Sequence, residues 1–307
     1  MKKLLVLISS IFVITALAIA QQDTAPVSQD RIVSTFEKAN QWLGKNNLSI
    51  TTSPEQAFLN DYIVVAAEGL PSPTAKTAAQ KRLTAERAAT TIAYRQLAEL
   101  IDGVAVVGDT LVKDTELQYD IVRTAVAGFI KGAQVVYKEW DSQEEVALVI
   151  VKIGMSGPEG FGSLMYKKII GDPKIKRNVV ESHPELKVKP VKLEENYDGL
   201  IIDATSVNFR PALINRIFTS KGEAIYDPSK VSQKVLIEQG CGEYTNSIEK
   251  AKAALEKRGV TNPLVIKAAG IVTPSDVQVS DEDAIKIYSA NQKTNFFAGA
   301  KVAFVLK

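Results

Sequence analysis

An alanine-rich stripe along one long predicted helix constrains the fold of this chain more than any other feature. Apolar residues recur at every fourth position of the segment 76–101, at Ala85, Ala89, Ala93, Leu97 and Ile101. This spacing places all five side chains on one side of an α-helix. Because three of them carry only a methyl group, the helix can lie close to a β-sheet. The sequence therefore predicts a long helix packed tightly on a sheet.

The segments around this helix are mostly typical of β-strands. Residues 62–67 predict a strand that ends at Gly69 and Pro71. The elements expected after it are a helix at 76–101, a strand at 104–112, a helix at 115–126, and a β-hairpin formed by 133–140 and 145–153. This β-α-β-α-β-β order predicts an α+β unit, at 60–153, with its helices packed on one face of a sheet.

A second, smaller α+β unit is expected over residues 199–307. Its predicted elements are a strand at 200–204, a hairpin at 216–226, a helix at 247–257, a strand at 264–271, a helix at 280–290 and a strand at 300–306. An N-terminal lead with a short helix, expected at 31–44, occupies 21–59. Residues 154–198 are expected to form a connector, and it is basic: eight basic and three acidic side chains lie between Lys167 and Lys192.

Residues 1–20 predict export from the cytoplasm. Lys2 and Lys3 precede an apolar run of 17 residues, which ends in the small residues of Ala18-Ile19-Ala20. This pattern is typical of a secretory signal peptide removed before Gln21. An uncleaved membrane anchor is the alternative, although 17 residues are marginal for spanning a bilayer. We expect the protein in the periplasm or outer cell envelope. No cysteine lies within the residues directly after the signal, so acylation at a signal-site cysteine is not expected.

The composition argues against some classes of partner. Without Lys2 and Lys3, the chain has 35 basic and 35 acidic side chains, so its net charge gives no reason to expect nucleic acid. An apolar content of 46% supports a packed core. Cys241 is the only cysteine, so the chain cannot form an intramolecular disulfide.

Few residues point to reaction chemistry. His183 is the only histidine and lies in the connector, where a zinc or catalytic role would need partners that the sequence does not offer. Cys241, between two glycines, is interpreted as a small buried residue at a strand end. Residues 157–162 lack a phosphate-loop pattern, and 281–283 indicate a helix start rather than a calcium loop. We predict no catalytic residue, no cofactor and no metal. The basic stretch 174–177 allows peripheral contact with the membrane or the cell wall.

Several segments of the first unit resemble the twenty-kilodalton LPP lipoprotein family. The helix-to-strand motif of that family resembles this chain at Arg82 and at residues 87–89, 93–99 and 101–104. The second motif of the family resembles the chain at residues 128–133. The motif positions singled out are Arg87, Tyr94, Gly103, Gly128 and Gly132. The flagellar accessory proteins FlgT and FlgP share this module.

The resemblance covers about residues 60–153 and implies a structural module of the cell envelope. In its flagellar members it implies a role in rings around the rod or motor. This chain differs from the lipoproteins because it lacks the acylated cysteine. Residues 199–307 resemble a companion region that accompanies the module in uncharacterised envelope proteins.

These observations favour a non-catalytic structural or assembly protein of the periplasm or cell envelope. Its expected partners are envelope proteins, further copies of itself or components of the flagellar basal body. The alternative is a ligand- or glycan-binding module, with its site in a cleft between the two units. A pocket lined by converging polar groups would favour that alternative. An enzyme would need paired acids in a cleft, and no spacing in the sequence singles out such a pair.

Overall fold

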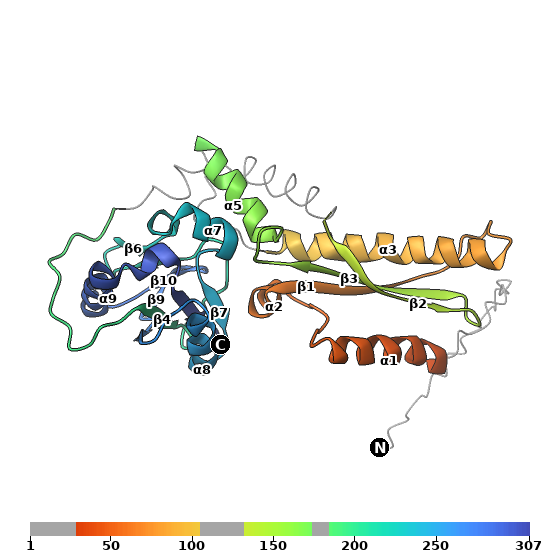
Figure 1. Ribbon diagram of the computed structural model, residues 1–307, viewed down its shortest axis with the longest axis horizontal. Helices are drawn as coiled ribbons and strands as arrows, with labels where there is room; N and C mark the ends of the chain where they lie inside the picture. Colours follow the sequence, from red (N-terminus) through yellow and green to blue (C-terminus); the bar gives the residue numbers. More distant parts are fainter. Residues whose placement is uncertain (1–28, 105–131, 174–183) are drawn as a thin grey trace, which may run out of the picture.

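A computed structural model describes residues 29–104, 132–173 and 184–307 (Figure 1). The signal segment, the predicted helix at 115–126 and nearly all of the predicted strand at 104–112 lie outside these residues. So do Gly128, His183 and the basic stretch 174–177. Within the described part of the chain the fold is α+β with two units, as the sequence predicts (Figure 1).

The first unit is built on a three-stranded antiparallel sheet. Its strands are β1 (Tyr62–Gly69), β2 (Gln134–Asp141) and β3 (Val146–Gly154), in the order β1-β3-β2. These bounds confirm the strand and the β-hairpin that the sequence predicts. The central strand β3 is buried without interruption from Ala147 to Val151, because both faces of the sheet are covered.

Helix α3 (Ala78–Asp102) covers one face of this sheet and confirms the predicted stripe (Figure 1). All five stripe residues are fully buried. The helix comes closest to β1 at Gly69, where an added Cβ would lie 2.3 Å from Ala89 N and 2.4 Å from Ala85 O. A residue with any side chain at this point of β1 would overlap the helix backbone. Thr77 begins the helix with a capping box to Gln80.

Helix α1 (Gln29–Lys45) covers the opposite face, which the sequence analysis did not assign to any element. It contains the short helix predicted at 31–44. Ala39 and Leu43 pack against Val64, Leu148 and Ile150, which belong to β1 and β3. The sheet therefore lies between two helices (Figure 1). Helix α2 (Pro54–Asn60), which was not predicted, leads directly into β1.

The second unit contains two four-stranded sheets. A parallel sheet has the order β7-β11-β4-β8, with β4 at Gly199–Asp203, β7 at Glu243–Thr245, β8 at Pro263–Lys267 and β11 at Val302–Val305. A mixed sheet has the order β6-β5-β10-β9, with β5 at Arg216–Phe218, β6 at Ala224–Tyr226, β9 at Gly270–Thr273 and β10 at Asp276–Gln278. The helices are α7 (Gln233–Gln239), α8 (Ile248–Glu256) and α9 (Asp281–Thr294).

Most elements predicted for the second unit are confirmed. The hairpin at 216–226 is the pair β5 and β6, and the two predicted helices are α8 and α9. Ser280 caps α9, because its hydroxyl accepts a hydrogen bond from Asp283 N at 3.1 Å. The single strand predicted at 264–271 is wrong: the chain leaves the parallel sheet after Lys267 and enters the mixed sheet at Gly270. Ala268 N bonds to β4 and Ala269 N bonds to β10, so the switch takes two residues.

The two units share one core. Helix α5 (Phe161–Gly171), which lies within the expected connector, packs against α7 of the second unit. Its buried side chains, which include Met165 and Tyr166, belong to a cluster of apolar residues that continues into both units. No helix in the described ranges is both long and apolar enough to cross a membrane.

Candidate functional site

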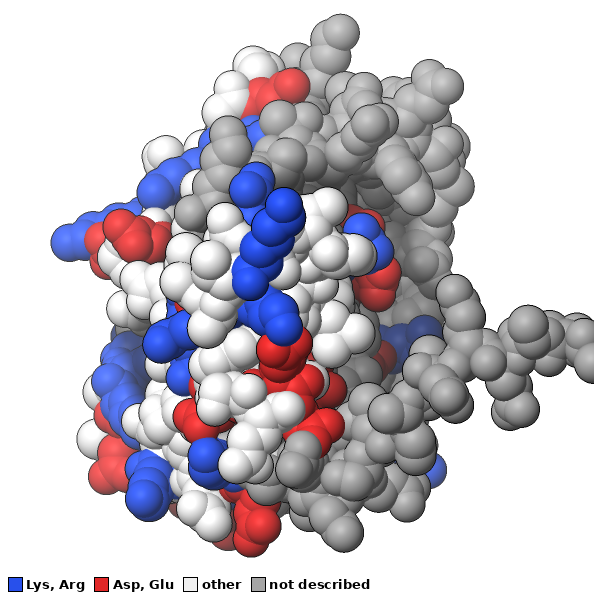
Figure 2. Space-filling model, turned by 90° about the vertical axis from the view of Figure 1, so that its right-hand side faces the viewer, with Lys and Arg blue, Asp and Glu red and all other residues white. Residues whose placement is uncertain are grey.

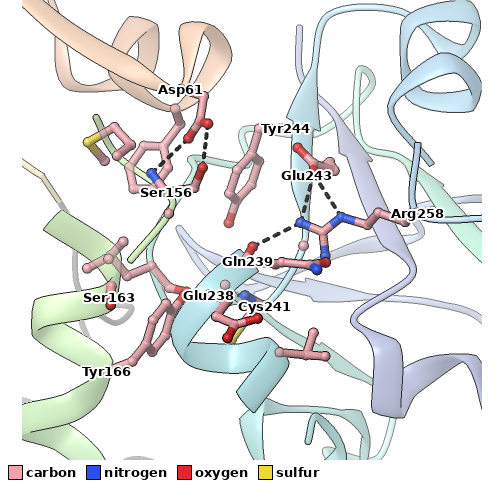
Figure 3. A pocket seen from close by; sticks show the side chains of 18 of the residues that line it. Asp61, Ser156, Ser163, Tyr166, Glu238, Gln239, Cys241, Glu243, Tyr244 and Arg258 are labelled. Atoms are coloured by element: carbon pink, nitrogen blue, oxygen red, sulfur yellow. Dashed lines mark hydrogen bonds and ion pairs between the residues drawn. The ribbon is translucent and has the colours of Figure 1, made fainter. Parts of the chain in front are cut away.

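A cavity of about 740 Å³ lies where the two units meet (Figure 3). The first unit contributes the junction of α2 and β1, the loop after β3, and α5. The second unit contributes the end of α7, the segment leading into β7, and α8. Its volume is within the range of small-molecule sites. The polar residues that Figure 3 labels converge on it from both units: Asp61, Ser156, Glu238, Gln239, Glu243 and Arg258.

Asp61 is the acidic residue that the first unit presents to the cavity. It ends α2 in a left-handed conformation, with φ of 59°, and its carbonyl oxygen accepts a hydrogen bond from Met155 N. The carboxylate accepts from Ser156 N at 3.0 Å and from Ser156 Oγ at 2.5 Å (Figure 3). These contacts hold the carboxylate in one orientation at the cavity wall.

The surroundings of Asp61 raise the pKa of its carboxyl group. The residue as a whole is exposed to solvent, but its carboxyl group lies against protein atoms of the cavity wall. This burial is the largest effect and raises the pKa of Asp61, while the hydrogen bonds from Ser156 act in the opposite direction. The charge of Glu243, across the cavity, raises the pKa of Asp61 further.

Arg258 organises the opposite wall. Its Nε lies 2.8 Å from Glu243 Oε1 and its Nη2 lies 2.7 Å from the same oxygen (Figure 3). The guanidinium also donates to Ala300 O and to Gln239 O, each at 2.9 Å. One side chain thus ties together α7, β7 and the turn before β11. Because four of its five N–H donors are engaged in these contacts, Arg258 positions the wall and has little of its guanidinium left for a ligand.

The inner wall is made of buried hydroxyl and thiol groups. Tyr166 Oη donates to Leu213 O and accepts from Cys241 N at 3.3 Å. Tyr244 Oη donates to Ala212 O at 2.8 Å, and burial raises its pKa. Cys241 is 2% exposed, and burial raises its pKa to about 12. A thiol held in its protonated form is not a nucleophile, so this wall does not provide one.

Asn215, also on the inner wall, has a polar atom without a partner. The residue is 1% exposed, and its Nδ2 donates to Tyr244 Oη at 3.0 Å. Its Oδ1 has no hydrogen-bond partner among the described residues. Exchanging the two ends of the amide is disfavoured, because the Tyr244 hydroxyl donates its one proton to Ala212 O and can only accept from Asn215. Buried polar groups nearly always find a partner, so this atom marks a place where one is missing.

The motif residues of the first unit lie outside this cavity. Arg87 is exposed on α3, and Tyr94 Oη donates to Ala133 O at 3.4 Å, which ties α3 to the start of β2. Gly103 follows α3 where an added Cβ would lie 2.9 Å from Pro54 Cγ. Gly132 is exposed in the turn before β2, and Gly128 lies outside the described residues. None of the described motif residues lines the site, and of these Tyr94 joins helix to sheet.

Other sequence features have structural roles. Asp281 lies at the start of α9, where Ser220 Oγ donates to it at 2.6 Å. Across the described ranges, no three His, Cys, Asp or Glu side chains cluster as metal ligands. The end of the first unit distant from the second carries basic and acidic side chains side by side (Figure 2). Ion pairs there include Lys81–Glu145 at 2.6 Å and Lys38–Glu139 at 2.7 Å.

The sequence analysis missed most of the cavity residues. Asp61, Asn215, Glu243 and Arg258 were not singled out, because they are far apart in the chain. One signal was present in the segment 239–244, where two glycines flank Cys241. Gly240 has φ of 76°, and a Cβ on Gly242 would lie 2.9 Å from Val302 O. Cys241 is buried directly before β7, which confirms its interpretation as a small residue at a strand end.

Comparison with known proteins gives one family match. Residues 199–307 match the family model described as Treponema pallidum Tp0624, second domain. The match covers about a third of the chain, namely the second unit and its half of the cavity. No curated protein matches the chain.

Proposed function

We propose that this protein is a non-catalytic binding protein of the cell envelope that holds a small ligand between its two units. The observation that carries the proposal is the cavity of about 740 Å³ with polar groups converging from both units. A packed interface without such a space would have favoured the purely structural hypothesis. The signal-peptide pattern of residues 1–20 supports the location in the periplasm or outer envelope.

The chemistry of the lining favours binding over catalysis. The Cys241 thiol is buried and protonated, and the Arg258 guanidinium is occupied by protein acceptors. The shared core beneath the cavity supports a preformed site, since α5 and α7 pack against each other at its edge. A preformed site binds without a large ordering cost.

A cavity-filling substitution tests this proposal. Gln239 lies at the mouth of the cavity with an exposed side chain, so Gln239→Trp should block entry without disturbing the core. Lys234→Trp, exposed on the same helix and outside the lining, is the matched control. The probes are a lysozyme digest of peptidoglycan and defined disaccharides and tripeptides.

A ligand at a hundred times its Kd stabilises the folded state by about 2.7 kcal/mol, which is a readily measured rise in Tm. We expect at least one probe to produce this rise in the wild type and in Lys234→Trp but not in Gln239→Trp. Equal responses of the two tryptophan variants, or no response in any protein, would contradict the proposal.

A second candidate function, assembly into an envelope structure, has its own observation. Strands β8 and β9 are unpaired on their outer side in the two described sheets of the second unit. Val265 on β8 is 40% exposed. It lies beside Ile201 of the neighbouring strand β4, and Ile201 is buried under α8. Val272 on β9 is 50% exposed. Open, apolar sheet edges are typical docking sites for a further strand.

Assembly is tested by sedimentation velocity and by crosslinking in envelope extracts. If these edges mediate self-association or bind envelope proteins, including flagellar basal-body components, Val272→Lys should abolish the larger species. A wild-type protein that sediments as a monomer and crosslinks to no envelope component would rule out this role.

A further inference from the structure

The Asp61 carboxylate, on the wall of the first unit, has hydrogen-bond acceptor sites that the protein does not use. The strongest donor of the cavity, Arg258, is already bonded to Glu243, Ala300 and Gln239. Lys257, directly after α8, and Lys301 also line the cavity on the side of the second unit, and Lys301 Nζ lies 3.3 Å from Gly259 O. Asp61, by contrast, has acceptor capacity left. A carboxylate provides about four lone-pair sites, and Asp61 uses two of them for Ser156.

The charge of Asp61 is also not met by a direct ion pair, although the charge of Arg258 across the cavity lowers its pKa. Glu243 forms its ion pair with Arg258 on the opposite wall. Among the described residues, no basic side chain forms an ion pair with Asp61 or with Glu238, which is exposed at the cavity rim. A cation beside Asp61 would gain Coulomb energy in a partly desolvated site, and it would offset the burial of the carboxylate.

The unpartnered oxygen of Asn215 is a second, independent indication. This side chain is 1% exposed and lines the same cavity. An unpaired buried acceptor is unfavourable, and a donor from a bound molecule would satisfy it. The missing partner is therefore a hydrogen-bond donor, in agreement with the unused acceptor sites of Asp61.

We infer that the cavity recognises its ligand through a protonated amine, with Asp61 as the ion partner and Asn215 as a further acceptor. The inference rests on the proposed binding function and names the ligand class. A primary ammonium group carries one positive charge and three donors, which fits a carboxylate and an amide oxygen. In an envelope such an amine comes from a peptide or from an amino sugar.

Paired probes that differ only at the amine test the inference in the full chain. The peptide pair is trialanine amide and its N-acetyl form. The sugar pair is chitobiose, with free amines, and N,N′-diacetylchitobiose. Isothermal titration calorimetry gives each Kd for the wild type, for Asp61→Asn and for the control Asp102→Asn. Asparagine tolerates the left-handed conformation of residue 61, and Asp102 is an exposed aspartate at the end of α3.

We expect one amine probe to bind at least about tenfold more tightly than its acetylated form, equivalent to about 1.4 kcal/mol. Asp61→Asn should remove this preference, while Asp102→Asn keeps it. The pair that responds identifies peptide or amino sugar as the source.

Equal binding of the free-amine and acetylated probes would overturn the inference, and so would an unchanged preference in Asp61→Asn. The proposed binding function would still stand in either case if Gln239→Trp blocks the binding of both probes. Failure of all four probes overturns the inference, and failure of the wider panel as well overturns the proposed function. A Tm measurement on Asp61→Asn confirms that the variant is folded.

Discussion

Removal of the buried ion pair between Arg216 and Asp276 should destabilise the second unit more than any surface substitution. The two residues face each other on the parallel strands β5 and β10. Arg216 Nε lies 2.8 Å from Asp276 Oδ1, and Arg216 Nη2 lies 2.7 Å from Oδ2. Their exposed fractions are 2% and 1%, and Thr273 Oγ1 donates to the same carboxylate.

The expected magnitude follows from what each substitution leaves behind. Asp276→Ala removes the carboxylate and leaves the guanidinium buried, with Phe218 at 5.6 Å beside it. Removing one partner of a buried pair costs about 3–5 kcal/mol, because here the buried guanidinium loses the carboxylate that it contacts through two nitrogens. Replacing both residues, in Arg216→Met/Asp276→Leu, removes both charges and should cost much less.

Urea unfolding followed by circular dichroism measures these changes. The shift of the midpoint, with the slope unchanged, gives the change in the free energy of unfolding. Lys286→Ala is the control, because its ion pair with Glu282 lies on the surface and should leave the midpoint unchanged. If Asp276→Ala and the double variant were equally destabilised, the buried guanidinium that Asp276→Ala leaves behind would not be the cause and this reasoning would be refuted.

Two further predictions concern the helix–sheet contact and the buried thiol. Gly69→Val should destabilise the first unit by about 1–3 kcal/mol in urea unfolding, because its Cβ would overlap the backbone of α3. Gly44→Ala, with nothing within 4 Å of the added atom, should not destabilise it. Cys241 should resist Ellman's reagent at pH 8 in the folded protein and react after unfolding in guanidinium; rapid reaction in the native state would contradict its burial. Because its folded pKa is raised from 9.0 to about 12, the stability it contributes is present below pH 9 and is lost as the pH rises toward 12. In a pH titration of stability, Cys241→Ser should therefore lose less than the wild type over this range.

The elements with strong local patterns were predictable from the sequence. The stripe of Ala85, Ala89 and Ala93 fixed the position of α3 and the face it buries. Ser280 marked the start of α9 through its capping hydroxyl. The strand predicted at 264–271 failed because one apolar run continues through β8 and β9. Alternation along a strand does not show that the chain moves from one sheet to another.

The cavity was less predictable, because no short segment contains it. Asp61 and Arg258 are on different units and meet only after both sheets have formed and α5 has packed on α7. Asn215 lies before the short strand β5 in a region without a distinctive pattern. The sequence analysis placed a ligand site in a cleft between the units only as its alternative. The resemblance of the first unit to the LPP lipoprotein family and its flagellar relatives stays a prediction.

Ligand-induced shifts of backbone amide signals test the central claim most directly. In a titration of the ¹⁵N-labelled chain with the amine probes, Ser156 of the first unit and Gly242 of the second should shift together. Both amides should report the same Kd, because both residues line one cavity. Shifts confined to one unit, or shifts at Val272 on the open edge with none at Ser156 and Gly242, would contradict binding between the units.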